Sequence, residues 1–163
     1  MAPARIVKEG MHMFNQRTAN LVLAVIILIL PILVFSLVAL GKGMSITNTL
    51  TALSEQLVSR RHNPIISSLL GFFPFMLMLI ILWVHRRFGG SQTLNLRLML
   101  GGAIPIILVL LWANFEFWPT FLPDRSSPGF PHGLELLIGP VFFAPVALLA
   151  GMLIVRIAWG KSK

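Results

Sequence analysis

Two carboxylates flank the most unusual segment of the sequence, an aromatic and proline-rich stretch at residues 112–133. Glu116 lies near its beginning and Glu135 just beyond its end, with Arg125 and His132 between them. Carboxylates that meet at a membrane boundary can accept a proton or bind a cation, because ionisable groups near a bilayer often mark ion paths. The simpler interpretation is a solvated or ion-paired set that anchors the segment. Either way, these four residues are the candidate polar site at the outer boundary.

A second charged group, His85, Arg86 and Arg87, is followed by Gly89 and Gly90. Cations beside an apolar segment attract the phosphates of anionic lipids, so the three basic residues are candidate contacts for such a lipid. Basic residues also fix the orientation of a membrane segment, and this simpler role explains the same pattern.

Small residues recur at helical spacing within the apolar segments. They let two helices approach closely, either within one chain or against a neighbour. The candidate helix-packing contacts are Ser67, Gly71, Gly101, Gly102, Ala147 and Gly151.

Ionisable residues are absent from the middle of every long apolar segment. Haem needs an axial ligand inside the bundle, retinal needs a buried lysine, and a proton-coupled carrier normally needs a buried carboxylate. The chain also has 0 Cys, which excludes thiol chemistry and disulfides. We therefore predict no catalytic residue, metal ligand or cofactor, and expect bound lipid as the only small molecule.

The composition excludes a soluble domain. Hydrophobic residues make up 56% of the chain and charged residues only 11%, which is too little polar surface to cover a soluble protein of 163 residues. The net charge of +8 does not indicate nucleic-acid binding, because the basic residues are scattered in twos and threes between apolar segments. Lipid headgroups are the phosphates that such residues meet.

Four apolar segments are long enough to cross a bilayer, which takes roughly 20 helical residues. They lie at about 18–41, 64–84, 98–118 and 133–157 and predict an all-α integral membrane protein with one four-span domain over residues 1–163. Each span contains proline, which we expect to kink the helix and shape its packing; the residues are Pro31, Pro74, Pro105, Pro140 and Pro145.

The Lys and Arg residues divide unevenly between the two sides of this topology. Nine lie on the side of the two termini and four on the other, which predicts that both termini are cytoplasmic, in a bacterial inner membrane. Trp83 and Trp159 are expected at the inner boundary, and Trp112 and Trp118 at the outer boundary.

The loop between the first two spans predicts a further helix. Ile46, Leu50, Leu53 and Leu57 are spaced by four, three and four residues and form one apolar stripe among polar side chains. We expect a short amphipathic helix at about 46–61 that lies in the outer interface, packed on its own bundle or docked on a partner chain.

The leading functional hypothesis is a non-catalytic accessory or structural subunit of a larger membrane complex, surrounded by lipid and by other membrane subunits. The alternative is a small oligomeric transporter or channel, with a pore between subunits lined by Ser67, Ser68, Asn114 and the two glutamates. A lipid-modifying enzyme ranks third because no nucleophile has a positioned base.

Overall fold

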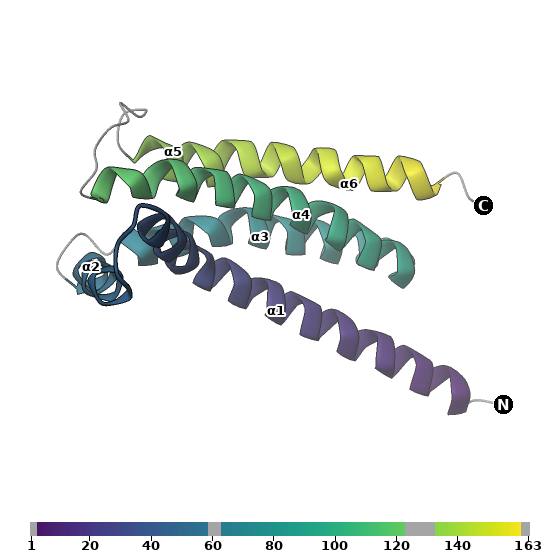
Figure 1. Cartoon of the computed structure of the whole chain (residues 1–163). Coiled ribbons are helices and arrows are strands. Elements are labelled where there is room, and N and C mark those ends of the chain that lie inside the picture. Colours follow the sequence, from purple (N-terminus) through teal and green to yellow (C-terminus); the bar gives the residue numbers. More distant parts are fainter. Residues whose placement is uncertain (1–2, 59–62, 123–132, 161–163) are drawn as a thin grey trace.

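The computed structural model describes residues 3–58, 63–122 and 133–160, with side chains described from residue 17 to residue 159 within these ranges. All the described elements are helices (Figure 1). A helix satisfies every backbone hydrogen bond within its own segment, which a lipid environment demands. In order they are α1 (Pro3–Gly41), α2 (Ile46–Val58), α3 (Asn63–Arg87), α4 (Gln92–Phe117), the 3-10 turn η1 (Trp118–Phe121), α5 (Leu134–Ile138), the π-helical turn η2 (Gly139–Phe143) and α6 (Ala144–Gly160).

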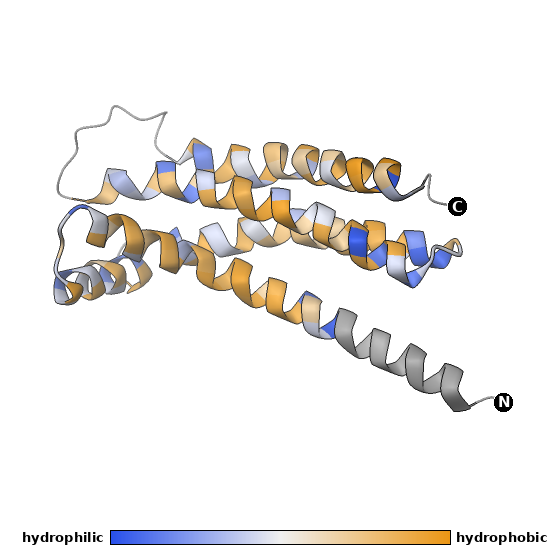
Figure 2. Cartoon of the chain, turned by 45° about the vertical axis from the view of Figure 1, so that its right-hand side comes forward, coloured by the Kyte–Doolittle hydropathy of each residue, from blue (hydrophilic) through white to orange (hydrophobic). Residues whose placement is uncertain are grey.

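Four helical stretches are long and apolar enough to cross a membrane, which confirms the expected number of spans and is compatible with an integral membrane protein. Orange, hydrophobic residues run along them in Figure 2. Their bounds are Arg17–Gly41, Asn63–Arg87, Gln92–Phe121 and Leu134–Trp159. The helix of the third span, α4, begins at residue 92, six residues before the predicted start of the span. Ser91 caps this helix by accepting a hydrogen bond from the Leu94 amide.

Helix α1 begins and α6 ends at the same end of the molecule, called here the terminal end (Figure 1). The opposite end, where α2 connects α1 to α3, is called the α2 end. An even number of spans requires this arrangement.

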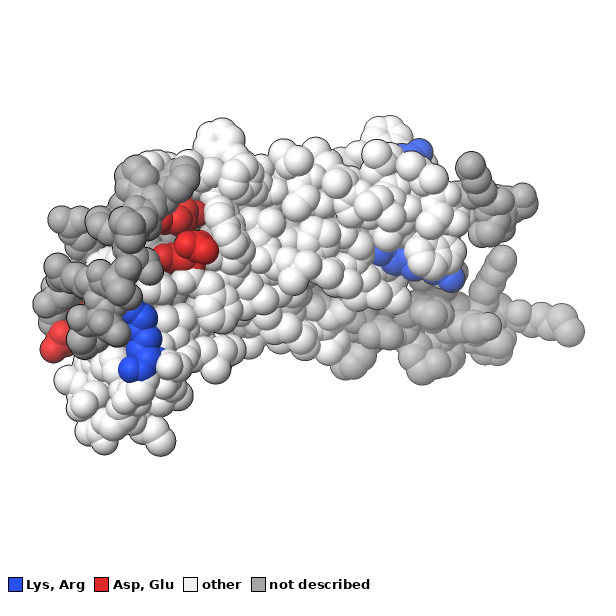
Figure 3. Space-filling model, turned by 45° about the horizontal axis from the view of Figure 1, so that its top comes forward, with Lys and Arg blue, Asp and Glu red and all other residues white. Residues whose placement is uncertain are grey.

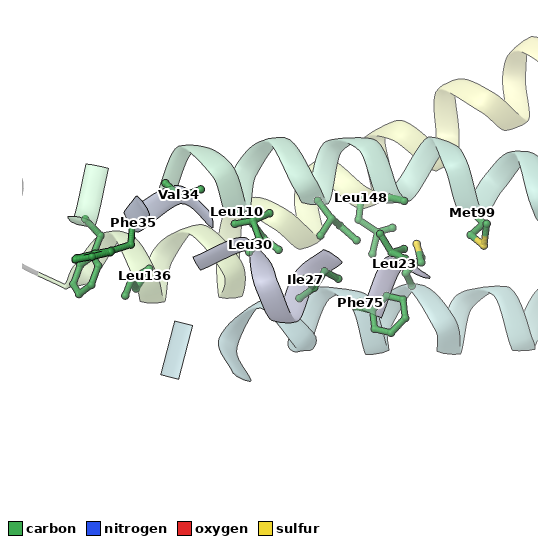
Figure 4. Close-up of a cluster of buried hydrophobic side chains, with 14 of the residues drawn as sticks. Leu23, Ile27, Leu30, Val34, Phe35, Phe75, Met99, Leu110, Leu136 and Leu148 are labelled. Carbon is green, nitrogen blue, oxygen red and sulfur yellow. The ribbon is translucent and has the colours of Figure 1, made fainter. Parts of the chain in front are cut away.

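The third span, α4, lies at the centre of the bundle. Both α3 and α4 contact α1 on one side and the last span, formed by α5, η2 and α6, on the other, whereas α1 and α6 share no contact within the described residues. The shared core is aliphatic and aromatic, as the close-up in Figure 4 shows for Ile27, Phe75, Leu110 and Leu148. The molecule is therefore a four-helix bundle in which the first and last spans lie on opposite sides of the α3–α4 pair.

The last span changes its helical geometry where prolines occur. Ala144 donates its amide to the Gly139 carbonyl, five residues back, which closes the π-helical turn η2. Pro140 is the second residue of this turn and Pro145 follows it in α6, and neither has an amide hydrogen to donate. The wide turn accommodates both prolines without ending the helix, so α5, η2 and α6 form one span.

Candidate functional site

A polar cluster lies inside the bundle toward the α2 end. The Ser67 hydroxyl on α3 donates a hydrogen bond of 2.9 Å to Asn114 Oδ1 on α4, and the Trp118 indole donates one of 3.0 Å to the same oxygen. Asn114 Nδ2 donates to the Leu110 carbonyl at 2.8 Å. All three side chains of the cluster are buried, at 3%, 2% and 0% exposure for Ser67, Asn114 and Trp118. Each polar group therefore has a partner, and the cluster joins α3, α4 and η1.

Trp118, which was predicted near the outer boundary, points into the bundle rather than toward its surface. Its ring is fully buried and packs edge-on against Phe35 of α1, with 5.3 Å between ring centroids. Phe117 lies 4.8 Å away on the same side. The indole N–H finds its acceptor one helical turn back, at Asn114, which removes the usual reason for a tryptophan to stay at the wet boundary.

Ser68 bonds to backbone rather than to another side chain. Its hydroxyl lies 2.9 Å from the Leu28 carbonyl of α1 and 2.9 Å from the Pro64 carbonyl of its own helix. Pro31 has no amide hydrogen, so the carbonyl that lacks its helical donor is that of Ile27, four residues back. The Ser68 hydroxyl lies at the adjacent carbonyl, and it adds a hydrogen bond between α1 and α3 rather than replacing the one that Pro31 removes.

The candidate packing residues lie at contacts within the chain. A Cβ on Gly71 would meet Ile27 of α1 at 3.1 Å and Leu110 of α4 at 3.3 Å. A Cβ on Gly101 would lie 2.5 Å from Val155 and 3.0 Å from the Gly151 carbonyl oxygen, so α4 and α6 approach almost backbone to backbone.

The other two small residues are also near this interface. A Cβ on Gly102 would lie 2.5 Å from Leu148 of α6, and Ala147 is half-buried on that helix. The Ser67 hydroxyl belongs to the polar cluster described above, where it donates to Asn114.

At the α2 end, Glu116 and Glu135 have different environments. Glu116 is exposed in the last turn of α4, whereas Glu135 is only 5% exposed in the first turn of α5. The Gly133 amide donates to Glu135 Oε2 at 3.1 Å, so this carboxylate caps the start of the last span. A negative group there also suits the positive end of the helix dipole.

Carboxylates gather at the α2 end, where Figure 3 shows two neighbouring groups of red atoms. Arg125 and His132, the other two members of the candidate outer site, lie outside the described residues. The part of the site that the structure describes thus consists of the helix-capping carboxylate of Glu135 and the exposed carboxylate of Glu116.

At the terminal end, the geometry of the turn between α3 and α4 requires the two glycines, Gly89 and Gly90. Gly89 has a left-handed φ of +80° and donates its amide to the Arg86 carbonyl at 3.2 Å. Gly90 donates to the His85 carbonyl at 3.0 Å, and the His85 ring occupies the space that a Cβ on Gly90 would take. Arg86 and Arg87 are exposed, while His85 is half-buried. The glycines form the turn. Arg86 and Arg87 are exposed beside it, and their contact with lipid headgroups stays a prediction.

Charged and aromatic side chains mark the two edges of the apolar layer. The Arg97 guanidinium of α4 lies over the Trp159 ring of α6, 5.1 Å from its centroid, at the terminal end. Glu116 lies near the other end of the same helix. Roughly nineteen residues separate the two positions, which is about 29 Å at 1.5 Å per residue. The hydrocarbon core of a bilayer is about 30 Å thick, so the spacing matches one membrane.

Asn95 and the Oδ1 atom of the half-buried Asn20 are buried polar groups that the sequence reasoning missed. Asn95 is 0% exposed in α4, and neither amide atom has a hydrogen-bond partner in the part of the chain that the structure describes. The same holds for the Oδ1 atom of Asn20 in α1. The signal was readable, because Asn95 precedes the core residues Met99 and Gly102 at helical spacing. The predicted span began at residue 98 and left it out.

No three His, Cys, Asp or Glu residues come together as a metal site within residues 17–58, 63–122 and 133–159. Comparisons with models of known families, with curated proteins and with solved structures find no match.

Proposed function

We propose that this chain is a non-catalytic subunit of a larger membrane complex, to which it contributes helix-packing and lipid-facing surface. The proposal places both termini in the cytoplasm of a bacterial inner membrane and α2 in the outer interface. The observation that carries it is the exposed apolar surface of the four spans, since at most 39% of the apolar core of any span is buried within the chain.

The use of the buried polar groups supports a structural role. Ser67, Ser68, Asn114 and Trp118 form hydrogen bonds that join elements of the bundle. Catalysis within the membrane needs polar groups that face a substrate. The polar groups of these four residues instead form hydrogen bonds within the chain.

The exposed apolar surface of α6 supports a role in contacts with helices of other subunits. Only 28% of the last span is buried within the chain, compared with 39% for the second and third spans. Large side chains project along its outer side, among them Val146, Leu153 and Ile154, with exposures of 68%, 57% and 67%. Such a helix needs either lipid or a further helix along this face.

Crosslinking in the native membrane tests the proposal. A photoreactive amino acid replaces Ile154 on α6, and in a matched variant it replaces Leu69 on α3, which is equally exposed at 66%. We expect a discrete protein adduct from at least one site, and co-purification of the same chain in mild detergent. Adducts with lipid alone from both sites, together with a stable lone monomer, would refute the proposal.

The transporter alternative loses part of its basis. Its pore lining drew on Ser67, Ser68 and Asn114, which are buried and hydrogen-bonded within one chain and so do not face a neighbouring subunit. Ion flux into liposomes that contain only this protein would nevertheless overturn the accessory role. We expect such liposomes to stay as tight as protein-free ones.

A further inference from the structure

Helix α2 contacts the bundle through a flank that does not coincide with its apolar stripe. Thr49 and Gln56 are buried, at 3% and 4% exposure, and Ala52 and Leu53 pack beside them. Asn63 of α3 donates a hydrogen bond of 3.0 Å to Gln56 Oε1 and fixes this flank at the start of the second span. The bundle therefore takes a partly polar side of α2.

The apolar edge of α2 is left uncovered by the part of the chain that the structure describes. Ile46 and Leu50 are 70% and 60% exposed, and Leu57 is half-buried. At 100° per residue these three fall within about 40° of one another, and their centre lies about 90° around the helix from the centre of the buried flank. The expected stripe is thus divided, with Leu53 toward the bundle and Ile46 and Leu50 away from it.

The remaining side of α2 is polar apart from Val58, the last residue of the helix, which is 76% exposed. Thr47, Thr51, Ser54 and Glu55 are all exposed on it. The hydroxyls of Thr51 and Ser54 donate to the carbonyls of Thr47 and Thr51, at 3.0 and 2.7 Å. Because these two hydroxyl groups already donate within their own helix, they have no free donor hydrogen for a polar partner. Burial of the apolar edge would therefore stabilise α2 more than a contact on the polar side would.

The position of α2 determines what lies next to that edge. The helix follows α1 after four residues and contacts α1 and α3, but neither α4 nor α6 in the described structure (Figure 1). It therefore lies at the level where two spans leave the apolar layer, on an outer side of the bundle. An edge between a protein-facing flank and a water-facing side, at this level, adjoins lipid.

We propose that α2 inserts the edge formed by Ile46 and Leu50 into the leaflet at the α2 end, and that its ligand is the headgroup and upper acyl region of the lipid. The edge continues the lipid-facing surface of the four spans. Because lipid covers an apolar edge without matching hydrogen bonds, it suits this surface better than a second polypeptide does. The inference rests on the proposed placement of the spans in a bilayer and not on the accessory role.

Site-directed spin labelling tests the insertion, because the chain has 0 Cys and single cysteines can be labelled cleanly. The variants are Ile46→Cys, Leu50→Cys, Thr47→Cys and Thr51→Cys, in vesicles of phosphatidylethanolamine and phosphatidylglycerol. Leu28→Cys, at a 52%-exposed position in the first span, sets the lipid reference. The measured quantity is the ratio of nitroxide collisions with oxygen, which partitions into lipid, to collisions with a water-soluble nickel chelate.

We expect ratios at positions 46 and 50 that are several-fold above those at 47 and 51 and that approach the ratio at position 28. Equal, low ratios at all four α2 positions would overturn the proposal, because the whole helix would then lie in water. Low collision rates with both reagents at 46 and 50 would also overturn it, since a protein surface would then cover the edge. Failure to find a partner chain would sink the accessory role and leave these ratios unchanged.

Discussion

The close contact between α4 and α6 makes Gly151→Ala the sharpest perturbation of this fold. A methyl carbon at position 151 would overlap the Gly101 carbonyl oxygen and lie 2.8 Å from Cγ of Pro105, where ordinary contact begins at 3.4 Å. The backbone oxygen cannot rotate away as the end of a flexible side chain can. The two helices must therefore separate by at least about 0.6 Å, and a gap of that size forfeits a quarter to a half of each atom–atom attraction across the interface.

The cost follows from the side chains at this interface. Leu148 is fully buried there, and a buried leucine makes about 40–60 atomic contacts of about 0.1–0.2 kcal/mol each. The loss of part of these contacts predicts a decrease of about 1–3 kcal/mol in the free energy of unfolding. In lipid this packing term is the main attraction between helices, so it is not replaced by a hydrophobic driving force.

Unfolding in mixed micelles with an increasing fraction of sodium dodecyl sulfate, followed by tryptophan fluorescence, measures the change. Gly41→Ala is the matched control, because a Cβ at that helical position meets nothing within 4 Å. The control isolates the gain in helix propensity, up to about 1 kcal/mol, that any Gly→Ala change brings. Equal stability changes in the two variants would refute the close-packing argument.

Three further outcomes follow from the buried polar groups and the carboxylates. Asn114→Leu leaves the indole and serine donors without an acceptor and should lower the free energy of unfolding by about 1–3 kcal/mol, whereas Ser67→Ala removes one bond and should cost roughly 0.6 kcal/mol; equal losses would contradict the shared acceptor. Asn95→Leu should stabilise the protein by about 1–3 kcal/mol, because it removes a buried amide without partners, and a lower midpoint in the same titration would show that the amide is bonded. Glu135→Gln should lower the unfolding free energy by about 0.3–1 kcal/mol through the lost cap charge, while exposed Glu116→Gln should leave it unchanged within about 0.5 kcal/mol; thermal unfolding of the pair checks the difference.

The number and approximate positions of the spans could be predicted because a continuous apolar run of about 20 residues has few other uses. The predicted span began at about residue 98 because the prediction followed hydropathy, whereas the helix itself begins at Gln92, after the capping serine at position 91. A helix can continue beyond the apolar layer when its cap and its core spacing allow it.

Tertiary partners were beyond the reach of the sequence. The small residues at 101 and 151 were recognised as packing positions, but their pairing depends on which face of α4 meets α6. Tryptophan is a residue type common at membrane boundaries, and the burial of Trp118 is explained only by its contacts with Asn114 and Phe35. Similarly, the amphipathic pattern of α2 gave its helix, while the division of the stripe depended on the position of α3.

The spacing of Arg97 and Glu116 along α4 has a consequence for the membrane in which the protein is most stable. An apolar layer of about 29 Å fits a bilayer of average thickness, while a sterol-rich plasma membrane is a few ångströms thicker, at about 32–33 Å. Hydrophobic mismatch costs fractions of a kcal/mol per ångström, and the central α4 has little freedom to tilt because α1, α3 and α6 all pack on it. We therefore expect the rigid centre of the bundle to be more stable in a bilayer of average thickness than in a thicker one.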